Sequence, residues 1–509
     1  MSNQTLPNLN RDYLEKNLLG TELAPFSKAI FDYPEKIIQF GEGNFLRGFV
    51  DWMVQQMNKK ALFNGRVVVV QPLPMGRVAN LNEQDGLYTM MLRGTIDGKV
   101  TDQREILASI SRGLDPYTQW EEVLQCAENP EIEYVVSNTT EAGIAYDPND
   151  KLTDAPPTSY PGKLTVYLYR RFTHFKGDAT KGLVIMPCEL IDRNGDKLKK
   201  VVLQLASEWQ LPAEFSQWLQ NSNYFLNTLV DRIVTGYPFK EIDQIEQELG
   251  YKDQNLNTAE LFHLWVIEGD AKHGEKLPLA QAGLNVKWVS DMTPYRTRKV
   301  RILNGAHTSA VAVAYLSNID LVKDAVEDNQ VGKFIRDVVF EEIIPTLDLD
   351  ANELEQFAKD VLERFNNPFI DHKWADISLN STSKFEARVL PSLKKYFERR
   401  KVLPKRLTFS LASLIALYHG TEIRGDKLVG HRDGQEYLLR DDQVILEFFR
   451  EIWASYEKTE ITLETLVEKV LNRFWAAEMK ELPTLASEVA TYLREILDAG
   501  MSRSLEKCS

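Results

Sequence analysis

The stretch IIQFGEGNFLRGF, residues 37–49, decides the fold, because an apolar strand candidate ends within it and a helix candidate begins. Gly41 permits a tight turn from the strand into the helix, and Gly43 lets the backbone come close to a pyrophosphate. Gly48 follows Gly43 by five positions instead of the usual three, so the glycine pattern of dinucleotide-binding proteins is matched only in part. The alternative is an ordinary glycine turn at a helix start. The position beside the first strand favours a nucleotide site.

The residues after the glycines predict a helix that packs on a sheet. Phe45, Phe49, Met53 and Met57 recur every four residues and supply one apolar face. Short β-rich runs alternate with helical runs over the first half of the chain, which is typical of a parallel sheet covered by helices. We predict strands over residues 36–40, 66–70, 133–136, 182–186, 261–267 and 285–289.

The later part of the chain has a helical pattern. Apolar residues recur at spacings of three and four over 329–347, 352–365 and 441–454, and the apolar run 407–418 reads as a buried helix that is too short to span a membrane. The predicted fold class is therefore α/β. A Rossmann-like, mostly parallel sheet domain over residues 1–290 precedes a mainly α-helical domain over residues 291–509.

Composition narrows the possible partners. The chain has 509 residues, with 60 Lys and Arg against 74 Asp and Glu, and its net charge of −14 disfavours nucleic acid. The N-terminus carries no readable secretory signal. Cys126, Cys188 and Cys508 are too scattered for a disulfide framework or a metal knuckle, which favours a reducing, cytoplasmic setting. We expect a small-molecule substrate, no nucleic acid or membrane partner, and a monomer or small homo-oligomer.

Two further segments bear on the cofactor. A site for NAD usually has an acidic residue at the end of the second strand, but here Gln71 stands there with Arg77 nearby, so NADP stays open while we expect NAD. In VVSNTTEAG, residues 135–143, Asn138 and Thr139 follow a strand and face a ligand, or Asn138 caps the next helix. The predicted cofactor residues are Phe40, Gly41, Gly43, Asn44, Phe45, Gln71, Asn138 and Thr139.

The segment YRTRKVRILNGAHTSAVAVAYL, residues 295–316, gathers three groups of different protonation chemistry. On an α-helix Asn304 and His307 share a face, and Lys299 lies about 7.5 Å back along the axis. A buried lysine can exchange a proton near neutral pH, while an amide and an imidazole can bind a developing alkoxide. A surface Lys, a helix Asn and a core His are the alternative. Gly305 weakens the helix and predicts close approach of the nicotinamide or of the first domain.

These motifs resemble the long-chain polyol dehydrogenases, also called the mannitol dehydrogenase family. The family's motif around an Asp is seen as YFLNTLVDRIVTG, residues 224–236, its Lys, Asn and His motif is seen at Lys299, Asn304 and His307, and its glycine-rich start is seen as GEGNFLRG. The resemblance covers most of the chain. The blocks VVSNTTEAGI, PCELIDRNGD, TLVDRIVTGYP and ILNGAHT are most similar to members that act on hexuronates.

The resemblance implies a zinc-independent, NAD-linked interconversion of D-altronate and D-tagaturonate in hexuronate (galacturonate) breakdown. It implies that Lys299 is the general acid and base, that Asn304 stabilises the oxyanion, and that His307 positions it. Asp231 is implied to be an accessory to substrate or proton handling. No metal is expected, and the sequence lacks HExxH, Cys clusters and closely spaced His ligands.

Departures from the family pattern bear on the substrate. Leu190 stands where mannitol dehydrogenases carry a second oxyanion-stabilising Asn, and Asp376 replaces an upstream Arg. Arg296 stands where they carry a Glu, with Arg298 close behind it. The segment SLNSTSKFEARVLP, residues 378–391, resembles the family around a lysine. Arginine forms forked hydrogen bonds to carboxylates, so we predict a sugar acid held by Arg296, Lys384 and Arg388, and the alternative is that these side chains lie on solvated helix faces.

Other functions stay open on the sequence alone. The protein could reduce a related substrate, such as fructuronate (giving mannonate), or act on mannitol or mannitol phosphate. A non-catalytic, nucleotide-sensing homologue that keeps the fold is the alternative outside the enzymes. The intact set of Lys299, Asn304 and His307 favours an enzyme.

Overall fold

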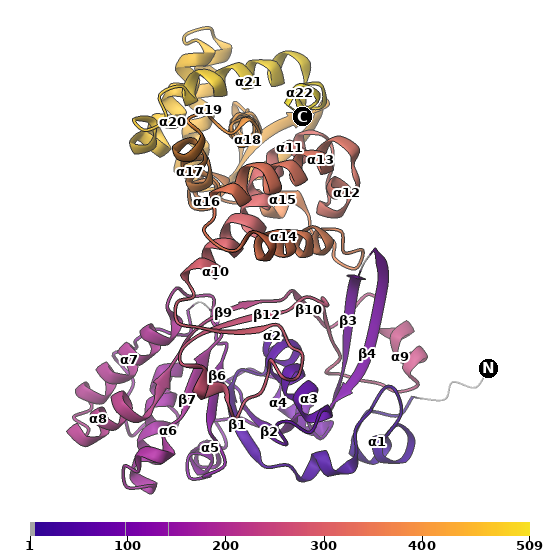
Figure 1. Ribbon diagram of the computed structural model, residues 1–509, viewed down its shortest axis with the longest axis vertical. Coiled ribbons are helices and arrows are strands. Elements are labelled where there is room, and N and C mark those ends of the chain that lie inside the picture. Colours follow the sequence, from indigo (N-terminus) through magenta and orange to yellow (C-terminus); the bar gives the residue numbers. More distant parts are fainter. Residues whose placement is uncertain (1–5, 97, 141, 509) are drawn as a thin grey trace. The chain divides into compact units, whose positions relative to one another are not determined.

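A six-stranded parallel sheet organises the first part of the chain (Figure 1). The computed structural model describes residues 6–96, 98–140 and 142–508. The strand order β5-β2-β1-β6-β7-β8 is the 3-2-1-4-5-6 order of a Rossmann fold when these strands are numbered along the chain. The strands are β1 (Glu35–Phe40), β2 (Arg66–Val70), β5 (Ile110–Leu114), β6 (Tyr134–Ser137), β7 (Val184–Pro187) and β8 (Tyr224–Phe225).

The chain divides into two units. Unit 1 comprises Met1–Gly94 and Thr101–Met292, and unit 2 comprises Thr95–Val100 and Thr293–Ser509. The parallel sheet belongs to unit 1.

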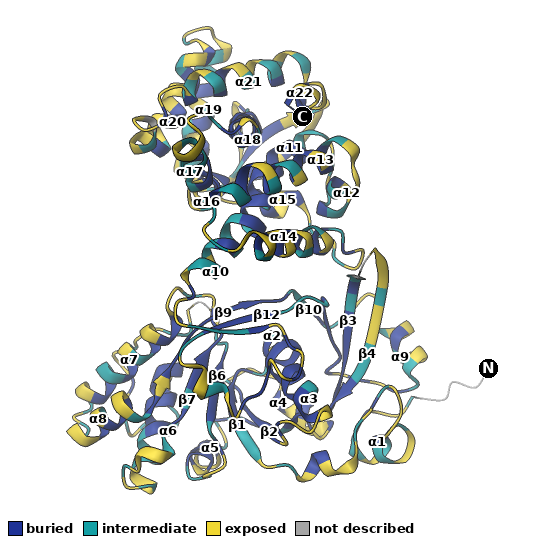
Figure 2. Cartoon of the chain, in the orientation of Figure 1, coloured by how far each residue is buried: buried dark blue, intermediate teal, exposed yellow. Residues whose placement is uncertain are grey.

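The side chains of the parallel sheet alternate between two cores. Ile37, Val67 and Val69 belong to one core, whereas Ile38, Val68 and Val70 belong to the other. This period of two is the side-chain period of a strand. Every residue of β2 is buried, because both faces of the sheet are covered. Figure 2 shows the exposed residues on the outward faces of helices such as α7 and α8.

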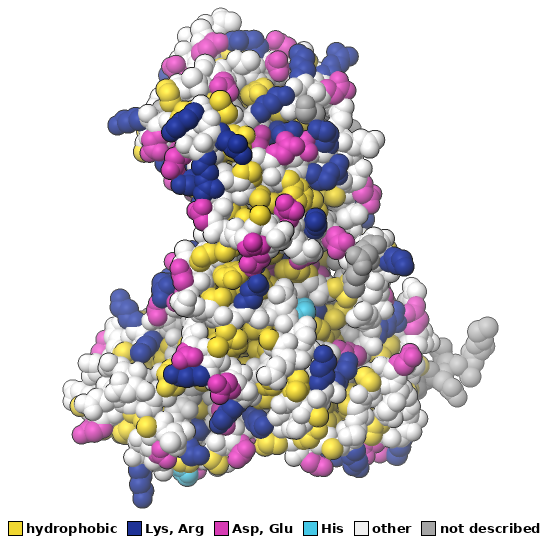
Figure 3. Space-filling model, in the orientation of Figure 1, with side chains coloured by type: hydrophobic (Ala, Val, Ile, Leu, Met, Phe, Trp, Pro, Cys, Tyr) yellow, Lys and Arg dark blue, Asp and Glu magenta, His cyan; other side chains and the backbone are white. Residues whose placement is uncertain are grey.

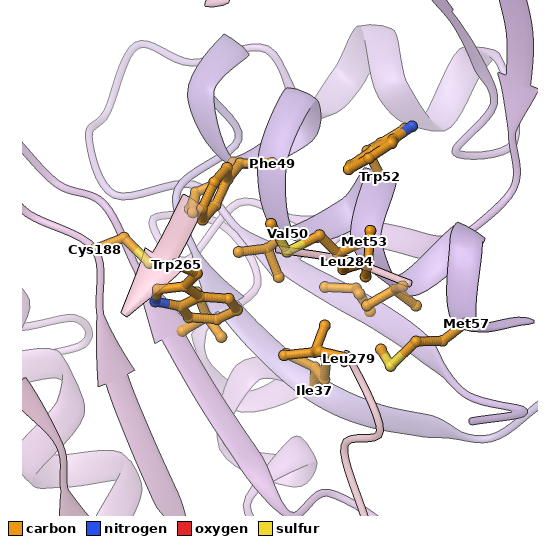
Figure 4. Packing of buried hydrophobic residues seen from close by; sticks show 14 of the residues in the cluster. Ile37, Phe49, Val50, Trp52, Met53, Met57, Cys188, Trp265, Leu279 and Leu284 are labelled. Atoms are coloured by element: carbon orange, nitrogen blue, oxygen red, sulfur yellow. The ribbon is translucent and has the colours of Figure 1, made fainter. Parts of the chain in front are cut away.

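Helices cover one face of the sheet, and helices together with a second sheet cover the other. The core around Ile38 is closed by α5 (Trp120–Cys126), α6 (Tyr160–His174), α7 (Asn194–Glu208) and α8 (Ala213–Ser222). The core around Ile37 is closed by α3 (Trp52–Lys59), α4 (Val78–Glu83) and a sheet of β13 (Val286–Val289), β12 (Leu264–Glu268) and β9 (Asn227–Asp231). Figure 4 shows this core, where the ring centroids of Phe49 and Trp265 lie 5.6 Å apart.

All six predicted strands are confirmed as β1, β2, β6, β7, β12 and β13, and the ends of all but β2 are shifted. The prediction lacked a four-stranded sheet of order β10-β11-β3-β4. Its strands are β3 (Tyr88–Ile96), β4 (Lys99–Leu107), β10 (Val234–Gly236) and β11 (Asn257–Ala259). The β4 sequence KVTDQREIL is largely polar, because much of this strand is exposed or half-buried, so it lacks the apolar run that identifies a buried strand. The shorter helices of unit 1 are α1 (Arg11–Asn17), η1 (Lys28–Asp32), η3 (Ala179–Lys181), α9 (Ile242–Leu249) and η4 (Ala271–Gly274).

Unit 2 is mainly helical and is built around α18 (Lys405–Leu417). Every residue of α18 from Leu407 to Leu417 is buried, which confirms the predicted buried helix. The Ser410 hydroxyl donates to the carbonyl oxygen of Ser309 at 2.7 Å and ties α18 to α11 (Gly305–Leu316). Further helices are α10 (Thr293–Arg298), η5 (Lys299–Asn304), α12 (Val322–Glu327), α15 (Trp374–Ile377), α16 (Ser381–Arg388), α17 (Leu390–Arg400), α20 (Leu463–Met479), α21 (Leu485–Ala499) and α22 (Met501–Cys508).

The predicted helical runs of unit 2 are present, and one of them changes its helix type along its length. The run 352–365 is α14 (Ala351–Phe365), and the run 441–454 lies in α19 (Gln443–Glu457). The run 329–347 begins as α13 (Asn329–Asp337), then becomes the π-helix η6 (Val338–Ile343) and the 3-10 turn η7 (Ile344–Thr346). Pro345 within η7 lacks the backbone N–H that an α-helix needs there. The sequence analysis did not predict the small antiparallel sheet of β14 (Glu422–Arg424), β15 (Lys427–Arg432) and β16 (Gln435–Arg440).

The predicted fold class is confirmed, because a mostly parallel Rossmann-like sheet precedes a mainly helical part. Within the described part of the chain, no helix is both long enough and apolar enough to cross a membrane.

Candidate active site

Gly41 and Gly43 shape the turn that follows β1. Gly41 has a φ of +132°, and a Cβ there would lie 3.0 Å from both the Asn138 carbonyl oxygen and the Leu46 side chain, so this position requires glycine. Gly43 differs, because a Cβ there would meet no atom within 4 Å. Phe40 is buried as the last residue of β1, paired with Val70 and Ser137. The backbone at Gly43 therefore borders open space, as the glycine pattern predicted.

The helix after the glycines runs from Asn44 to Lys59 through α2 (Asn44–Leu46), the π-helix η2 (Arg47–Asp51) and α3. Its predicted apolar face is confirmed, because Phe49, Met53 and Met57 are fully buried in the core that Figure 4 shows. Phe45 stacks on Phe49 with ring centroids 5.0 Å apart. A Cβ at Gly48 would lie 2.9 Å from Val234, so the third glycine lets β10 approach the helix.

The buried Arg47 side chain holds the glycine turn by hydrogen bonds. Its guanidinium donates to the carbonyl oxygens of Glu42 and Asn255 and to the Asn44 side-chain oxygen at 3.1, 2.5 and 2.8 Å. Burial lowers the pKa of Arg47. The Asn44 side chain is therefore held by an internal partner, in contrast with its predicted contact to a cofactor.

A cavity of about 560 Å³ opens at this turn within unit 1. Four of the eight predicted cofactor residues line it, namely Gly41, Gly43, Asn138 and Thr139. The other lining residues are Glu42, Pro72, Leu73, Thr140, Ala142, Gly143, Ala145, Tyr146, Asp147, Pro148, Thr158, Ser159 and Tyr160. Phe40, Asn44, Phe45 and Gln71 do not line it, because Phe40 and Phe45 pack into the cores on either side of β1 and the side chains of Asn44 and Gln71 are engaged elsewhere.

Asn138 and Thr139 are fixed by the end of the neighbouring strand. The Asn138 amide donates to the Cys188 carbonyl oxygen at 3.0 Å, and the backbone N–H and hydroxyl of Thr139 donate to the Glu189 carboxylate at 3.0 and 2.9 Å. The alternative that Asn138 caps the next helix is wrong, because the next described helix, α6, begins only at Tyr160. These two residues instead form part of the cavity wall.

Glu189 is a buried residue that holds the cavity wall in place and that the sequence did not indicate. It is 2% exposed and also accepts a hydrogen bond from the Ser137 hydroxyl at 3.1 Å. Burial raises the pKa of this carboxyl, and the hydrogen bonds from Thr139 and Ser137 oppose that rise. The next residue, Leu190, is 63% exposed, so no amide donor replaces the family's second Asn at that position. An acidic residue three positions after the predicted strand 182–186 was the available signal.

Gln71 is turned away from the cavity. Its amide nitrogen donates to the carbonyl oxygens of Leu73 and Pro74 at 2.8 and 3.3 Å, and the side chain is 3% exposed. A Cβ at Gly76 would lie 2.3 Å from the Gln71 amide oxygen, so the loop closes over this side chain. Gln71 therefore supports its own loop.

Asp231 is the last residue of β9, and Arg232 follows it. Both lie in unit 1. Asp231 is 5% exposed and pairs with Leu264 of β12. Arg232 donates to the carbonyl oxygens of Glu260 and Gly48 at 3.0 and 2.8 Å and lies over the Trp52 ring. Burial lowers the pKa of Arg232 to about 9. Neither residue lines the cavity at the glycine turn.

In unit 2 Lys299 begins a π-helical segment, which the sequence analysis did not foresee. The segment η5 spans Lys299–Asn304 and lies between α10 and α11 without a break. Backbone hydrogen bonds of a π-helix join residues five apart, so Lys299 and Asn304 lie one turn apart and not on different faces, as an α-helix would place them. Lys299 and Asn304 are both half-buried. Single π turns are frequent at functional sites.

His307 lies in a box of aromatic rings on the first turns of α11. Its ring stacks on Phe365 with centroids 4.1 Å apart, and His372 lies edge-on at 4.9 Å. Burial lowers the pKa of His307 well below its usual value, and the nearby His372, Arg364, Arg388 and Lys384 lower it further. The ring is therefore neutral at physiological pH. Its Nε2 atom is buried and has no hydrogen-bond partner among the described residues.

Lys384 and Arg388 lie on α16, which packs against the helix α11 that carries His307, and both lower the pKa of His307. Lys384 donates to the Ile377 carbonyl oxygen at 2.8 Å, and burial followed by Arg388 lowers its pKa. Arg388 is half-buried, its pKa is lowered by burial, and within the described ranges it makes no ion pair or side-chain hydrogen bond. Unit 2 thus brings together His307 and two of the three predicted substrate-binding residues.

The two arginines of α10 differ. Arg296 is exposed. Arg298 is 3% exposed, pairs with Glu353 at 2.7 Å and lies 4.3 Å from the Phe357 ring centroid. The Arg298 guanidinium therefore holds α10 against α14.

The structure shows one close neighbour that explains a glycine at position 305. A Cβ there would lie 3.2 Å from the Arg388 carbonyl oxygen. The close neighbour that favours glycine is therefore the end of α16 within unit 2. Among the described residues, no group of three or more His, Cys, Asp or Glu side chains is arranged to hold a metal ion.

The predicted resemblance to a known family is confirmed by comparison with other proteins. Residues 35–281 match the mannitol dehydrogenase Rossmann domain, and residues 291–497 match the mannitol dehydrogenase C-terminal domain. Altronate oxidoreductase of Bacillus subtilis (strain 168) is 47% identical over 487 residues, which cover 94% of this chain and 97% of the relative. Altronate oxidoreductase of Bacteroides thetaiotaomicron is 47% identical over 473 residues, covering 93% and 96%.

Solved structures agree with this fold. A D-sorbitol dehydrogenase in substrate-free form is 22% identical with a TM-score of 0.77, covering 98% of this chain and 100% of that chain. Pseudomonas fluorescens mannitol 2-dehydrogenase, in a ternary complex with NAD and D-mannitol, is 19% identical with a TM-score of 0.67, covering 98% and 99%. This chain therefore belongs to the mannitol dehydrogenase family and is an oxidoreductase of the polyol and sugar-acid class.

Proposed function

We propose that this protein is an NAD-dependent, metal-independent oxidoreductase that interconverts D-tagaturonate and D-altronate by direct hydride transfer, in hexuronate (galacturonate) catabolism. The observation that carries the substrate class is the packing of α16, which bears Lys384 and Arg388, against α11, which bears His307. The charges of Arg364, Arg388 and Lys384 all lower the pKa of His307. The relatives named altronate oxidoreductase, at 46–47% identity over more than nine-tenths of the chain, support the same substrate.

The residues at the glycine turn fit a dinucleotide. Gly43 offers its backbone to open space, and the helix that begins at Asn44 directs its first N–H groups toward the turn. Asn138 and Thr139 form the opposite wall of the same cavity. A dinucleotide bound here would supply the redox chemistry, as the hydride acceptor (NAD+) when altronate is oxidised and as the hydride donor (NADH) when tagaturonate is reduced. In this proposal the domain of residues 1–290 binds the dinucleotide. The domain of residues 291–509 carries the substrate-binding and proton-transfer groups.

A carboxylate fits the group around His307 because its charge offsets the repulsion among the cations there. Arg388 offers a half-buried guanidinium with no internal partner among the described side chains, and a guanidinium can form two parallel hydrogen bonds to a carboxylate. Lys384 adds a second positive charge. A neutral polyol would make no ion pair with Arg388 or Lys384, so the site favours a sugar acid.

Lys299 performs the proton transfer in this proposal. Its amine takes the proton from the substrate hydroxyl when altronate is oxidised and returns it to the oxygen when tagaturonate is reduced. Asn304, one π-helical turn along, donates its amide N–H to the developing oxyanion. His307, held by the Phe365 ring, presents Nε2 to the same oxygen. Asp231 and Arg296 keep their proposed accessory and substrate-binding roles.

The proposal is tested by following NADH absorbance with purified protein and a panel of substrates. We expect turnover with tagaturonate that exceeds turnover with fructuronate, fructose or mannitol 1-phosphate under matched conditions. Preference for any of those substrates would contradict the substrate assignment. Failure of all of them, despite NADH binding, would favour the non-catalytic alternative. Prior treatment with a chelator should leave the rate unchanged, and loss of activity that added metal restores would contradict metal independence.

A further inference from the structure

The residue that usually reads the adenosine ribose is not available in this cavity. In Rossmann domains an acidic side chain at the end of the second strand bonds the ribose hydroxyls, and an arginine nearby accommodates a 2′-phosphate instead. Gln71 occupies that position here, but both ends of its amide face its own loop, next to Leu73, Pro74 and Gly76. Pro72 and Leu73 line the cavity, whereas Gln71 does not.

Glu42 supplies a carboxylate to this cavity from the turn that follows β1. It stands between Gly41 and Gly43, lines the cavity and is half-buried. Its Oε1 atom accepts a long hydrogen bond, 3.4 Å, from the backbone N–H of Arg77. Arg77 precedes α4 in the loop that follows β2, so the Glu42 side chain reaches from the glycine turn to the loop where the adenosine ribose binds in this fold.

The surroundings of Glu42 show that its charge is not consumed by an internal ion pair. Burial raises the pKa of Glu42, and backbone N–H groups followed by the charges of Arg47 and Arg77 oppose the rise. Arg47 bonds the Glu42 backbone oxygen and leaves the carboxylate to the cavity. The Arg77 guanidinium is exposed and, within the described ranges, has no ion pair or side-chain hydrogen bond.

We propose that Glu42 binds the adenosine ribose hydroxyls and makes this protein select NAD over NADP. A carboxylate accepts hydrogen bonds from both ribose hydroxyls, whereas it repels a 2′-phosphate at the same position. Arg77 has the opposite preference, so the selectivity depends on which of these two charges dominates near the ribose. The inference rests on the proposed function, because it assumes a dinucleotide in this cavity, and it assigns the choice of cofactor to a residue outside the second strand.

The test measures binding of NADH and NADPH separately, by titration of nicotinamide fluorescence, in the wild type and in Glu42→Gln. We expect the wild type to bind NADH more tightly. In Glu42→Gln the ratio of the two dissociation constants should shift toward NADPH by at least about tenfold, the size of one lost charge-assisted hydrogen bond. Glu83→Gln, an exposed carboxylate on α4, is the matched control and should leave the ratio unchanged.

Two further variants separate the possible outcomes. Adding Arg77→Ala to Glu42→Gln should remove the affinity gained for NADPH. Glu42→Ala, which also removes the carboxylate, serves if Glu42→Gln does not fold. An unchanged ratio in a folded Glu42 variant that still binds NADH would overturn the role of Glu42 alone. A shift in the ratio caused by Gln71→Ala would return that role to Gln71. If the wild type binds neither dinucleotide, the proposed function itself fails.

Discussion

Lys299 is the one side chain on which the proposed proton transfer depends, so its removal should affect the chemical step and not cofactor binding. We expect Lys299→Ala to lower kcat by about 10²- to 10⁴-fold, the usual contribution of a general acid or base. The dissociation constant for NADH should stay the same, because the predicted dinucleotide residues lie in unit 1. Stopped-flow reduction of tagaturonate and fluorescence titration of NADH measure the two quantities. Near-normal turnover would remove Lys299 from the mechanism.

Arg388 should discriminate between charged and neutral substrates. Removing a charge-assisted hydrogen bond costs about 1.5–3 kcal/mol, so Arg388→Ala should raise KM for tagaturonate about 10- to 100-fold. A neutral ketose such as fructose should be turned over more slowly, and its KM should not rise comparably in Arg388→Ala. Lys395→Ala, at a half-buried cation on α17 that pairs with Glu398, is the control for an unspecific loss of positive charge. Equal effects on the acid and the ketose would show that Arg388 does not bind the carboxylate.

Residues of the candidate site were predictable where a side chain has a recognisable chemical role. The sequence predicted Gly41, Gly43 and His307 from spacing and residue type. It did not predict Glu42, because this residue occupies the variable position between two glycines, nor Glu189, because the hydrogen bonds to Ser137 and Thr139 join separate strands. The sequence also could not show that the polar end of Gln71 bonds to its own loop or that Arg298 pairs with Glu353. The direction of a side chain depends on packing that no single segment encodes.

At the scale of elements, the junction between β1 and η2 contains a buried acid. Gln39 donates through its amide nitrogen to Asp51 Oδ2 at 3.1 Å, and the remaining oxygens, Gln39 Oε1 and Asp51 Oδ1, are buried without a partner among the described residues. A proton on Asp51 provides the O–H that the Gln39 oxygen can accept. Burial raises the pKa of Asp51 from 3.8 to about 7, in agreement with a protonated pair.

This acid should make stability depend on pH in a definite direction. Between about pH 4 and pH 7 the folded protein holds a proton on Asp51 that the unfolded chain has lost, so this group's contribution to stability falls as the pH rises through that window. Asp51→Asn keeps the shape without the titration and should flatten the curve. Urea unfolding at pH 5, 6, 7 and 8 measures the effect, with the exposed Asp243→Asn as control. Parallel curves for Asp51→Asn and the wild type would contradict the raised pKa.

Elements were predictable to the extent that their residues share one environment. The strand β2 was predicted without error because its five residues are all buried and give a continuous apolar run. The strand β4 and the hairpins β14 to β16 carry exposed polar residues and gave no such run. The π-helices η2, η5 and η6 were not predictable, because their residues fit the spacing of an α-helix equally well.

The visible face of the molecule in Figure 3 carries charged side chains of both signs. On the face that Figure 3 shows, Lys and Arg side chains are interspersed with Asp and Glu in both units. The net charge of −14 therefore coexists with a local group of cations beside His307. Local groups of charge, and not the total, decide which small anions a protein binds.

The coupling of cofactor binding to global stability gives a further prediction. A ligand at 100 times its dissociation constant stabilises the folded state by about 2.7 kcal/mol, so NADH should raise the Tm of the wild type. Gly43→Ala should fold with an unchanged Tm, since its Cβ meets no atom within 4 Å, but should lose the rise caused by NADH because the Cβ occupies the pyrophosphate's approach. Gly41→Ala, with its φ of +132°, should lower the Tm even without NADH. An intact NADH response in Gly43→Ala would place the pyrophosphate elsewhere.

The hydrogen bonds that join Glu189 to Ser137 and Thr139 limit how this protein can be recombined with its relatives. A chimera that exchanges only the segment after β6 would place the hydrogen-bond donors of a relative next to the Glu189 carboxylate of this protein. Because the two strand ends share these bonds, residues 137–140 and 187–190 have to be transplanted together. A graft of one without the other should express as a folded protein with a misplaced cavity wall.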